Sequence, residues 1–277
     1  MTSVISDFDI YHFDLLGYVL LKGALSKDEV DALNAGVGAI PQMACNDWYG
    51  YVQAHSFEAN NGTNLQQIYE AGEPFEALID HPAWIDHIKT FVGGEGSFDH
   101  KHGALFIDEN FASLRAPGEA IGMHSGGDSW SKRNQYRVKN GKFMVGQVNM
   151  LLALTEIKEG DGGTTIIPAS HKQNFQHPGM AEYRMGGSQC SGDGMPLSLE
   201  VFMDPGDVLI FADTICHGSA KRVNEGERRI VVYRYGPSWG FFRHPYRPSP
   251  ELLERLTPER RAIVWPHEPI ERTPNLL

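Results

Sequence analysis

The chain has few cysteines, and those that it has are not spaced to cross-link or to hold a metal. Cys45, Cys190 and Cys216 are an odd number, and no two of them form a Cys-x-x-Cys motif. Disulfide frameworks need pairs of cysteines, and thiolate zinc sites draw on closely spaced ones. The sequence therefore predicts neither, and it favours a reducing, cytoplasmic setting.

Long apolar runs and an excess of positive charge are also lacking. No apolar stretch approaches the roughly 20 residues of a membrane-spanning helix, and residues 1–10 show no basic start or apolar core of a secretory signal. The formal net charge is −11, whereas nucleic acids and anionic membranes attract clustered Lys and Arg. We expect no nucleic-acid or membrane partner, and the sequence leaves the oligomeric state open.

The chain is nevertheless long enough for one enzyme-sized core. It has 277 residues, of which 41% are hydrophobic. It contains no repeat, linker or low-complexity tract. We expect a single domain over residues 1–277, with a helical buttress and the first strands in 1–94, the core of the fold in 95–240 and a helical extension in 241–277.

Helix signals gather in the first third of the chain and at its end. Ser26 and Glu29 form a capping box that opens one helix, which Gly36 and Gly38 are expected to end. The other predicted helices lie at residues 8–17 and 82–92 and begin again after Ser249 and Thr257.

Short β-rich runs replace the helical pattern after residue 94. Turn signals such as Gly160–Gly163 and Pro205–Asp207 separate these runs. Helices followed by strands predict a mainly β fold with flanking helices, in which an antiparallel double-sheet barrel is buttressed by the helices. The predicted strands are residues 18–21, 104–107, 147–154, 164–167, 208–212 and 229–235.

Residues 41–72 carry only a weak pattern and are rich in Asn, Gln and aromatic side chains. They are interpreted equally well as a substrate-facing loop or as surface coil. Several large side chains are candidates for lining a pocket, although packing of loops is the simpler role for each. These are Trp48, Tyr49, Tyr51, Trp130, Arg133, Tyr136, Trp239 and Phe241.

The segment with the most chemical content is Gly122–Asp128, taken together with His217. An iron centre that binds oxygen keeps open positions opposite a few protein ligands, so two histidines and one carboxylate recur in non-haem oxygenases. His124 precedes one long strand-like run and His217 follows another. Two facing strands are therefore expected to bring the two imidazoles together.

The chain resembles the phytanoyl-CoA dioxygenase family of iron(II)- and 2-oxoglutarate-dependent oxygenases over most of its length. The resemblance implies a double-stranded β-helix, a cupin-like jelly-roll barrel whose mouth holds Fe(II) and 2-oxoglutarate. It also implies a dioxygenase that uses O₂ to oxidise a small organic molecule. The motifs that carry it are Gly17–Leu20, Gly160–Gly163, Ile167–Lys172, Pro205–Phe211 and His217–Ser219.

The family pattern of His-x-Asp, a distal His and an Arg eleven positions later falls on His124, Gly126, His217 and Arg228. The two histidines are then expected as iron ligands. Arg228 is expected to hold the far carboxylate of 2-oxoglutarate, because a planar guanidinium pairs both oxygens. Arg229 is its competitor, since neighbours on a strand face opposite sides and the register can slip by one residue. The spacing favours Arg228.

Other polar positions carry weaker signals. Gln147 and Asn149 alternate on one face of an otherwise apolar run, so they are candidate cosubstrate contacts, with a satisfied core amide slightly favoured. His171 lies in one of the shared motifs and is expected to be structural.

Gly126 departs from the family because it supplies no oxygen where the iron-binding Asp is expected. Asp128 is the candidate third ligand, since the glycines before it let the chain loop back; a turn-forming Asp is the other interpretation. A second hypothesis is a 2-oxoglutarate-dependent halogenase, which resembles this family, carries Ala or Gly at this position and holds chloride there. A third is a non-catalytic binding module on the same fold, against which the intact histidines and arginine argue.

Overall fold

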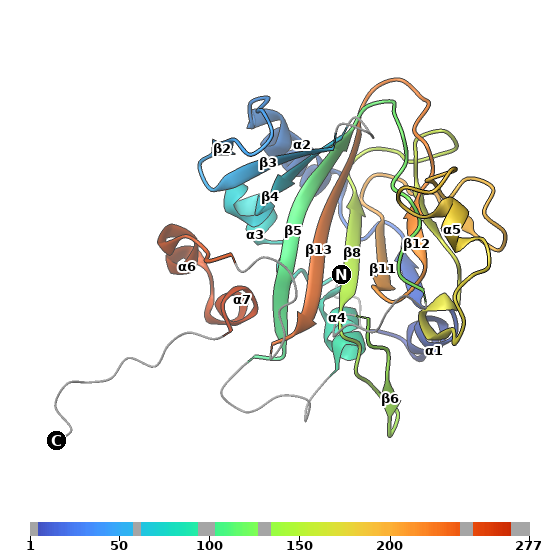
Figure 1. Cartoon of the computed structure of the whole chain (residues 1–277). Helices are drawn as coiled ribbons and strands as arrows, with labels where there is room; N and C mark the ends of the chain where they lie inside the picture. Colours follow the sequence, from blue (N-terminus) through green and yellow to red (C-terminus); the bar gives the residue numbers. More distant parts are fainter. Residues whose placement is uncertain (1–4, 58–61, 94–102, 127–133, 239–245, 267–277) are drawn as a thin grey trace, which may run out of the picture.

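A computed structural model describes residues 5–57, 62–93, 103–126, 134–238 and 246–266. A large twisted antiparallel sheet of eight strands runs through the middle of the molecule, in the order β1-β11-β8-β13-β5-β4-β3-β2 (Figure 1). Its strands are β1 (Tyr18–Leu21), β2 (Trp48–Tyr49), β3 (Val52–Phe57), β4 (Gly62–Gln66), β5 (Leu105–Arg115), β8 (Val148–Ala153), β11 (Val208–Ala212) and β13 (Arg228–Pro237).

A three-stranded sheet, in the order β10-β9-β12, packs against the inner face of the large one. Side chains such as Leu151 and Leu209 of the large sheet share one buried apolar cluster with Ile166 and Val201 of the small sheet. This arrangement confirms the predicted mainly β, double-sheet barrel. The remaining strands are β9 (Thr164–Ile166), β10 (Leu199–Val201), β12 (His217–Ser219) and the hairpin β6 (Val138–Lys139) with β7 (Lys142–Phe143).

Helices α1, α2, α3 and α4 pack against the outer face of the large sheet. The main apolar core lies between these helices and the sheet. It includes Phe13 of α1 and Phe91 of α4, whose ring centroids are 3.7 Å apart. None of the helices in the described ranges is both long and apolar enough to cross a membrane. The helices are α1 (Asp7–Leu16), α2 (Lys27–Ala39), η2 (Ile68–Ala71), α3 (Glu73–Glu76), α4 (Ile85–Val92), η3 (Ser170–Lys172), α5 (Met180–Tyr183), α6 (Pro250–Arg255) and α7 (Pro258–Val264).

Helix α2 begins as predicted but ends later. The Ser26 hydroxyl accepts a hydrogen bond from the Glu29 amide, and the Glu29 carboxylate accepts one from the Ser26 amide, which completes the capping box. The helix continues through Gly36 and Gly38 to Ala39, so the predicted end was wrong. Gly36 serves packing instead, because a Cβ there would lie 2.7 Å from the Phe75 ring.

Residues 41–72 form more structure than a loop or coil. They contain the antiparallel strands β2, β3 and β4 and the 3₁₀ helix η2, so the segment is neither a loop nor a coil, although several of its side chains line the cavity described below. Strand β4 pairs with β5, which adds this hairpin to the edge of the large sheet. The segment therefore extends the inner face of the sheet beyond the barrel strands.

Candidate active site

A cavity of about 1050 Å³ opens on the inner face of the large sheet. It is lined by β3, β4, β5, β8, β11 and β13 of that sheet and by β12 of the small one. This volume lies at the upper end of the range of about 300–1,000 Å³ for small-molecule sites. The cavity can accommodate two small ligands at once.

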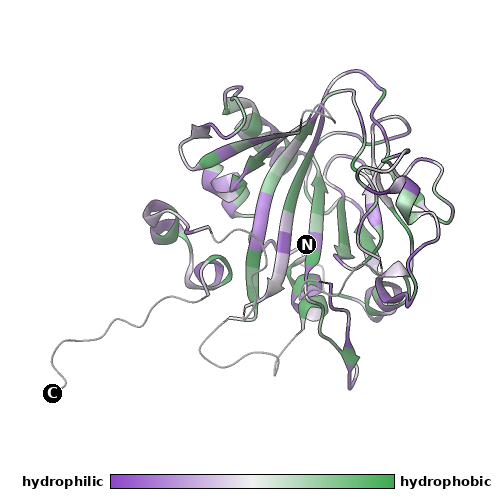
Figure 2. Cartoon of the chain, in the orientation of Figure 1, coloured by the Kyte–Doolittle hydropathy of each residue, from purple (hydrophilic) through white to green (hydrophobic). Residues whose placement is uncertain are grey.

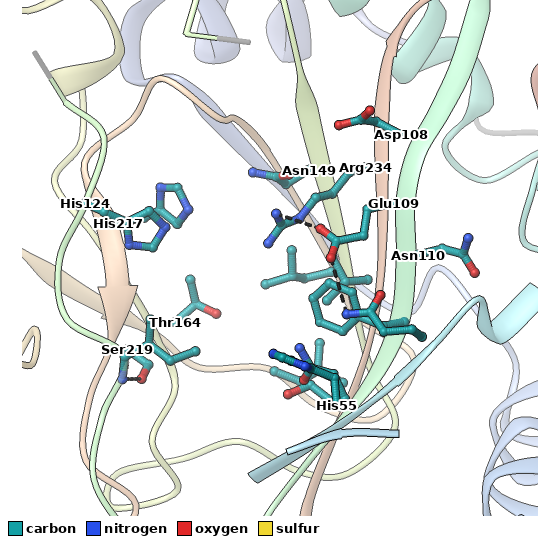
Figure 3. Close-up of a pocket in the computed structure, with 18 of the residues that line it drawn as sticks. His55, Asp108, Glu109, Asn110, His124, Asn149, Thr164, His217, Ser219 and Arg234 are labelled. Carbon is teal, nitrogen blue, oxygen red and sulfur yellow. Dashed lines mark hydrogen bonds and ion pairs between the residues drawn. The ribbon is translucent and has the colours of Figure 1, made fainter. Parts of the chain in front are cut away.

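His124 and His217 lie side by side in the wall of this cavity (Figure 3). An isolated β-bridge joins them: the His124 amide donates to the His217 carbonyl at 2.8 Å, and the His217 amide donates back at 3.0 Å. Their ring centroids are 4.1 Å apart. The two imidazoles therefore meet as the sequence predicted, although by direct backbone pairing rather than from two facing strands.

Each imidazole is oriented by its own backbone. Nδ1 of His124 lies 3.0 Å from the Gly122 carbonyl oxygen, and Nδ1 of His217 lies 2.7 Å from that of Ile215. A carbonyl only accepts hydrogen bonds, so each Nδ1 carries the proton and the lone pair resides on Nε2. Metal-binding histidines are commonly fixed in this way.

Burial keeps His217 neutral. Loss of water around the ring, and then the neighbouring His124, hold the pKa of His217 well below its usual range. A neutral imidazole is the form that binds a metal. This histidine therefore needs to lose no proton at neutral pH in order to act as a ligand.

Gly126 lies tightly against the segment that leads to His217. Its φ is +62°, its amide donates to the Thr214 carbonyl at 2.9 Å, and a Cβ there would lie 2.5 Å from Cβ of Cys216. Position 126 thus has no room for a carboxylate side chain. Asp128 lies outside the described residues, and among those described no group of three His, Cys, Asp or Glu side chains could hold a metal ion.

We expect Gly126→Ala to lower the free energy of unfolding by about 2–5 kcal/mol. This is the sum of the cost of a left-handed backbone angle for alanine and the cost of overpacking against Cys216. Gly50 is a matched control, because its φ is +59° and nothing lies within 4 Å of a Cβ placed there. Gly50→Ala should cost only the backbone contribution of about 1–2 kcal/mol. Urea unfolding measures both variants, and equal losses would contradict the packing role of Gly126.

Arg228 points from β13 into the same cavity. It is 4% exposed, one of its Nη atoms donates to the Gly162 carbonyl, and its Nε has no hydrogen-bond partner in the described part of the chain. Arg229 turns to the other side, where its side chain donates to Glu227 and to Asn34. The strand register therefore gives Arg228, and not Arg229, access to the cavity.

Positive charge accumulates around Arg228. Arg115 stands directly opposite on β5, is 2% exposed and donates to Oγ of Ser219 at 3.0 Å. Burial, and then nearby guanidinium groups, lower the pKa of Arg228 to about 9 and that of Arg115 to about 10. Arg222 is also close, but it pairs with Asp161 at 2.9 Å. Two buried cations facing each other favour a bound anion.

Sequence reasoning missed Arg115. It ends a run whose first residues alone were predicted as a strand, and nothing in its neighbours signals a functional role. The strand pairing of β5 with β13 is what brings it opposite Arg228. Ser219 is the other new member, since it lines the cavity and accepts hydrogen bonds from both Arg115 and the Ile121 amide.

The two candidate amides have different surroundings. Gln147 is fully buried, donates to Asp108 at 2.9 Å and is not part of the cavity wall. Asn149 does line the cavity and donates to Asp213 at 2.9 Å, while its Oδ1 has no partner among the described residues. Asn149 therefore lies where a ligand in the cavity can reach it, whereas Gln147 lies behind the wall and hydrogen-bonds within the core.

His171 lies outside the cavity wall and is wedged between neighbouring elements. Its Nε2 is 3.1 Å from the Asp14 carbonyl, its ring contacts Tyr136 with centroids 4.4 Å apart, and a Cβ on Gly17 would lie 2.3 Å from its Nδ1. Burial lowers the pKa of His171 to about 4. These contacts agree with a structural role.

This burial makes stability depend on pH. The pKa of the His171 imidazole is about 6.5 in the unfolded chain and about 4 in the folded protein. Its contribution to the free energy of unfolding is therefore fully present above pH 6.5 and is lost as the pH falls toward 4. Between pH 7.5 and 5 we expect His171 to account for a loss of about 2 kcal/mol. Urea unfolding at both pH values should show a smaller loss for His171→Gln, and an unchanged loss would contradict this assignment.

Of the eight side chains proposed to line a pocket, the four that the structure describes lie away from the cavity wall. Trp48, Tyr49 and Tyr51 are exposed and not part of the cavity wall. Tyr136 donates to Asp14 and packs against the core. Trp130, Arg133, Trp239 and Phe241 lie outside the described residues.

The barrel and its two histidines beside a buried arginine define the class of double-stranded β-helix oxygenases. The phytanoyl-CoA dioxygenase family model matches residues 13–230. "Dioxygenase cdmD" of Talaromyces verruculosus is 30% identical over 278 residues, which cover 92% of this chain and 82% of that protein. The chain therefore belongs to the phytanoyl-CoA dioxygenase family of iron(II)- and 2-oxoglutarate-dependent dioxygenases, and it is an enzyme rather than a binding module.

Solved structures have the same fold. HygX from Streptomyces hygroscopicus, with nickel and 2-oxoglutarate bound, has a TM-score of 0.69 at 18% identity and covers 90% of this chain and 94% of its own. A second HygX structure also contains hygromycin B. SnoK, a non-heme alpha-ketoglutarate-dependent carbocyclase from nogalamycin biosynthesis, has a TM-score of 0.59 at 14% identity and covers 98% of this chain and 96% of its own. These likenesses confirm the double-stranded β-helix.

Proposed function

We propose that this enzyme is an iron(II)- and 2-oxoglutarate-dependent oxygenase that oxidises a C–H bond of a small organic molecule. His124 and His217 hold the iron, Asp128 completes the ligand set, and Arg228 holds the far carboxylate of 2-oxoglutarate. The observation that carries the proposal is the buried Arg228, which shares one cavity with the paired imidazoles. The three free cysteines support a cytoplasmic location.

The residues fit both groups. The imidazoles are anchored through Nδ1, which leaves Nε2 as the metal-binding nitrogen, and the unpartnered Nε of Arg228 gives a dicarboxylate a donor. Iron with 2-oxoglutarate would supply the chemistry by which O₂ oxidises a C–H bond. The protein orients the cosubstrate through Arg228 and excludes water with apolar side chains such as Leu151 and Phe211.

Second contacts keep this arrangement in place. Arg115 binds Ser219 beside Arg228, so the serine hydroxyl is directed by a fixed donor. The Asn149 side chain donates a hydrogen bond to Asp213. Its Oδ1 has no partner among the described residues, and a water or the cosubstrate in the cavity would supply one. Gln147 acts only indirectly, by fixing Asp108.

The test is oxygen-dependent turnover. The protein is loaded with Fe(II) and 2-oxoglutarate without oxygen and then exposed to it, and succinate is measured. We expect slow succinate formation without substrate, which disappears when the metal is chelated. Absence of succinate at full metal and 2-oxoglutarate occupancy would overturn the proposal.

Asp128 and the halogenase hypothesis are separated by one further variant. If Asp128 is an iron ligand, we expect Asp128→Ala to weaken iron binding more than tenfold, since even residues that only support ligands change metal affinity by about 10- to 100-fold. Asp128→Glu should retain part of this affinity. Unchanged affinity in Asp128→Ala, together with a halogenated product when chloride or bromide is present, would instead assign the site to halide.

A further inference from the structure

The β3–β4 hairpin presents a polar face to the cavity, far from the histidines along the sheet. Strand pairing sets Gln53 opposite Gln66 and His55 opposite Asn64, and all four side chains line the cavity. The alternate positions, Val52 and Leu65 among them, are buried in the apolar core. We call the four residues Gln53, His55, Asn64 and Gln66 the polar hairpin face.

Strand β5 continues this surface toward the iron end. Gln66 donates to Glu109 at 3.3 Å, and the Glu109 carboxylate pairs with Arg234 of β13 at 3.0 Å. Figure 3 shows this pair and His55 across the cavity from His124 and His217. The polar groups are thus connected to one another and separated from the imidazoles by the cavity.

A β-bulge in β5 brings two consecutive acidic residues to the part of the cavity wall next to the hairpin. The register between β13 and β5 shifts between Arg234 and Tyr235, so that Asp108 is an extra residue, and both Asp108 and Glu109 line the cavity. Glu109 pairs with Arg234, and Asp108 accepts a hydrogen bond from Gln147 at 2.9 Å. Figure 2 shows the hydrophilic segments on adjoining parts of β5 and β13. An anionic ligand is disfavoured in this half.

The iron end has the opposite character. Leu151 and Phe211 line the cavity on this side, and the ring centroids of Phe211 and His217 are 4.8 Å apart, so the group that is oxidised meets an apolar surface. Arg228, which lines the same cavity, is occupied by the cosubstrate under the proposed function. A substrate therefore has its hydrogen-bonding groups at the hairpin and its reacting C–H bond at the iron.

We infer that the substrate is a neutral or cationic molecule rich in hydroxyl or amine groups, recognised by the polar hairpin face and Glu109. Amide side chains both donate and accept, which suits hydroxyl groups, and carboxylate oxygens in the wall accept hydrogen bonds from hydroxyl or ammonium groups. A polyanionic acyl-coenzyme A and a flat apolar polycycle match neither feature. The inference rests on the proposed function and names its substrate class.

Binding of defined probes tests the inference. Protein loaded with Fe(II) and 2-oxoglutarate without oxygen is titrated by calorimetry with 2-deoxystreptamine, glucosamine, sucrose, octanoyl-coenzyme A and testosterone. We expect at least one of the three hydroxyl-rich probes to bind and to stimulate succinate formation on adding oxygen, and the last two to do neither. Binding only by octanoyl-coenzyme A or testosterone, or by none of the three hydroxyl-rich probes, would overturn the inference.

Matched variants locate the binding. Asn64→Leu and Gln66→Met keep side-chain size but remove hydrogen bonds. Each should lower the affinity for the bound probe by about three- to tenfold, which corresponds to roughly one hydrogen bond. Thr63→Val is the control, because Thr63 is on β4 but not in the cavity wall. Glu109→Gln should weaken the amine probes and spare sucrose. Equal affinities in all these proteins would refute the hairpin's role.

The inference and the proposed function fail in different ways. Succinate formation without substrate and 2-oxoglutarate binding report only on the iron end. If both persist while the hairpin variants leave probe binding unchanged, the oxygenase stands and the substrate class is wrong. If no succinate forms in any protein, the proposed function itself is wrong.

Discussion

Arg228→Gln is expected to raise the KM for 2-oxoglutarate about a hundredfold or more. Removing one partner of a buried, hydrogen-bonded charge pair costs about 2–5 kcal/mol, or about 30-fold to several thousandfold in affinity. Arg228 is 4% exposed and lies in the cavity wall. Steady-state succinate formation at varied 2-oxoglutarate measures the change.

Arg229→Gln is the matched control for this experiment. Arg229 is the adjacent residue of the same strand, but its side chain pairs with Glu227 and Asn34 on the other face. Its variant should keep the KM within about twofold, since exposed ion pairs contribute about 0–1 kcal/mol. Similar KM values for the two variants would contradict Arg228 as the 2-oxoglutarate ligand.

Arg228→Lys separates charge from geometry. A lysine keeps the positive charge but contacts a carboxylate as a point, whereas the guanidinium pairs both oxygens. We expect its KM to lie between those of the wild type and Arg228→Gln. A KM equal to the wild-type value would mean that charge alone, supported by Arg115 on the facing strand, is enough to hold the anion.

Features that depend on neighbours in sequence were predictable. The capping box of Ser26 and Glu29 and the cap residues Ser249 and Thr257 start helices in the structure as expected. The family spacing favoured Arg228 over its neighbour Arg229, and the strand register places Arg228 in the cavity wall. Local chemistry thus predicted where elements begin and which residue types they carry.

Features that depend on distant contacts were not predictable from the same patterns. Glycine normally weakens a helix, but Gly36 stays inside α2 because the Phe75 ring fills the space of its missing side chain. The hairpin in residues 41–72 was missed because its inner face is polar: amides take the positions that apolar side chains occupy in an ordinary half-buried strand. A strand whose exposed face meets a ligand lacks the usual signal.

The tight contact at Gly126 belongs to the same group. The sequence shows only that a carboxylate is missing between His124 and Asp128, and not that a side chain at that position would meet Cys216. The contact explains why glycine is present there on packing grounds alone. The missing carboxylate is therefore not by itself a sign of lost activity or of halide binding.

His217→Ala is expected to lower iron affinity more than a hundredfold and to abolish oxygen-dependent succinate formation at micromolar iron. Loss of residues that merely support ligands costs about 10- to 100-fold in metal affinity, so loss of a direct ligand should exceed this. His217 is 7% exposed, so alanine leaves an empty space at this position and supplies no metal-binding atom in its place. Anaerobic iron titration measures the affinity directly.

His124→Ala should have an effect of the same size, because its Nδ1 anchor and backbone bridge mirror those of His217. His81→Gln is the control: His81 pairs with Glu29 outside the cavity wall, so iron affinity should not change. A loss of activity in the alanine variants at unchanged iron affinity would contradict their role as ligands. If both variants bind iron weakly yet still bind 2-oxoglutarate through Arg228, the two halves of the site act independently, as separate anchoring of imidazoles and guanidinium implies.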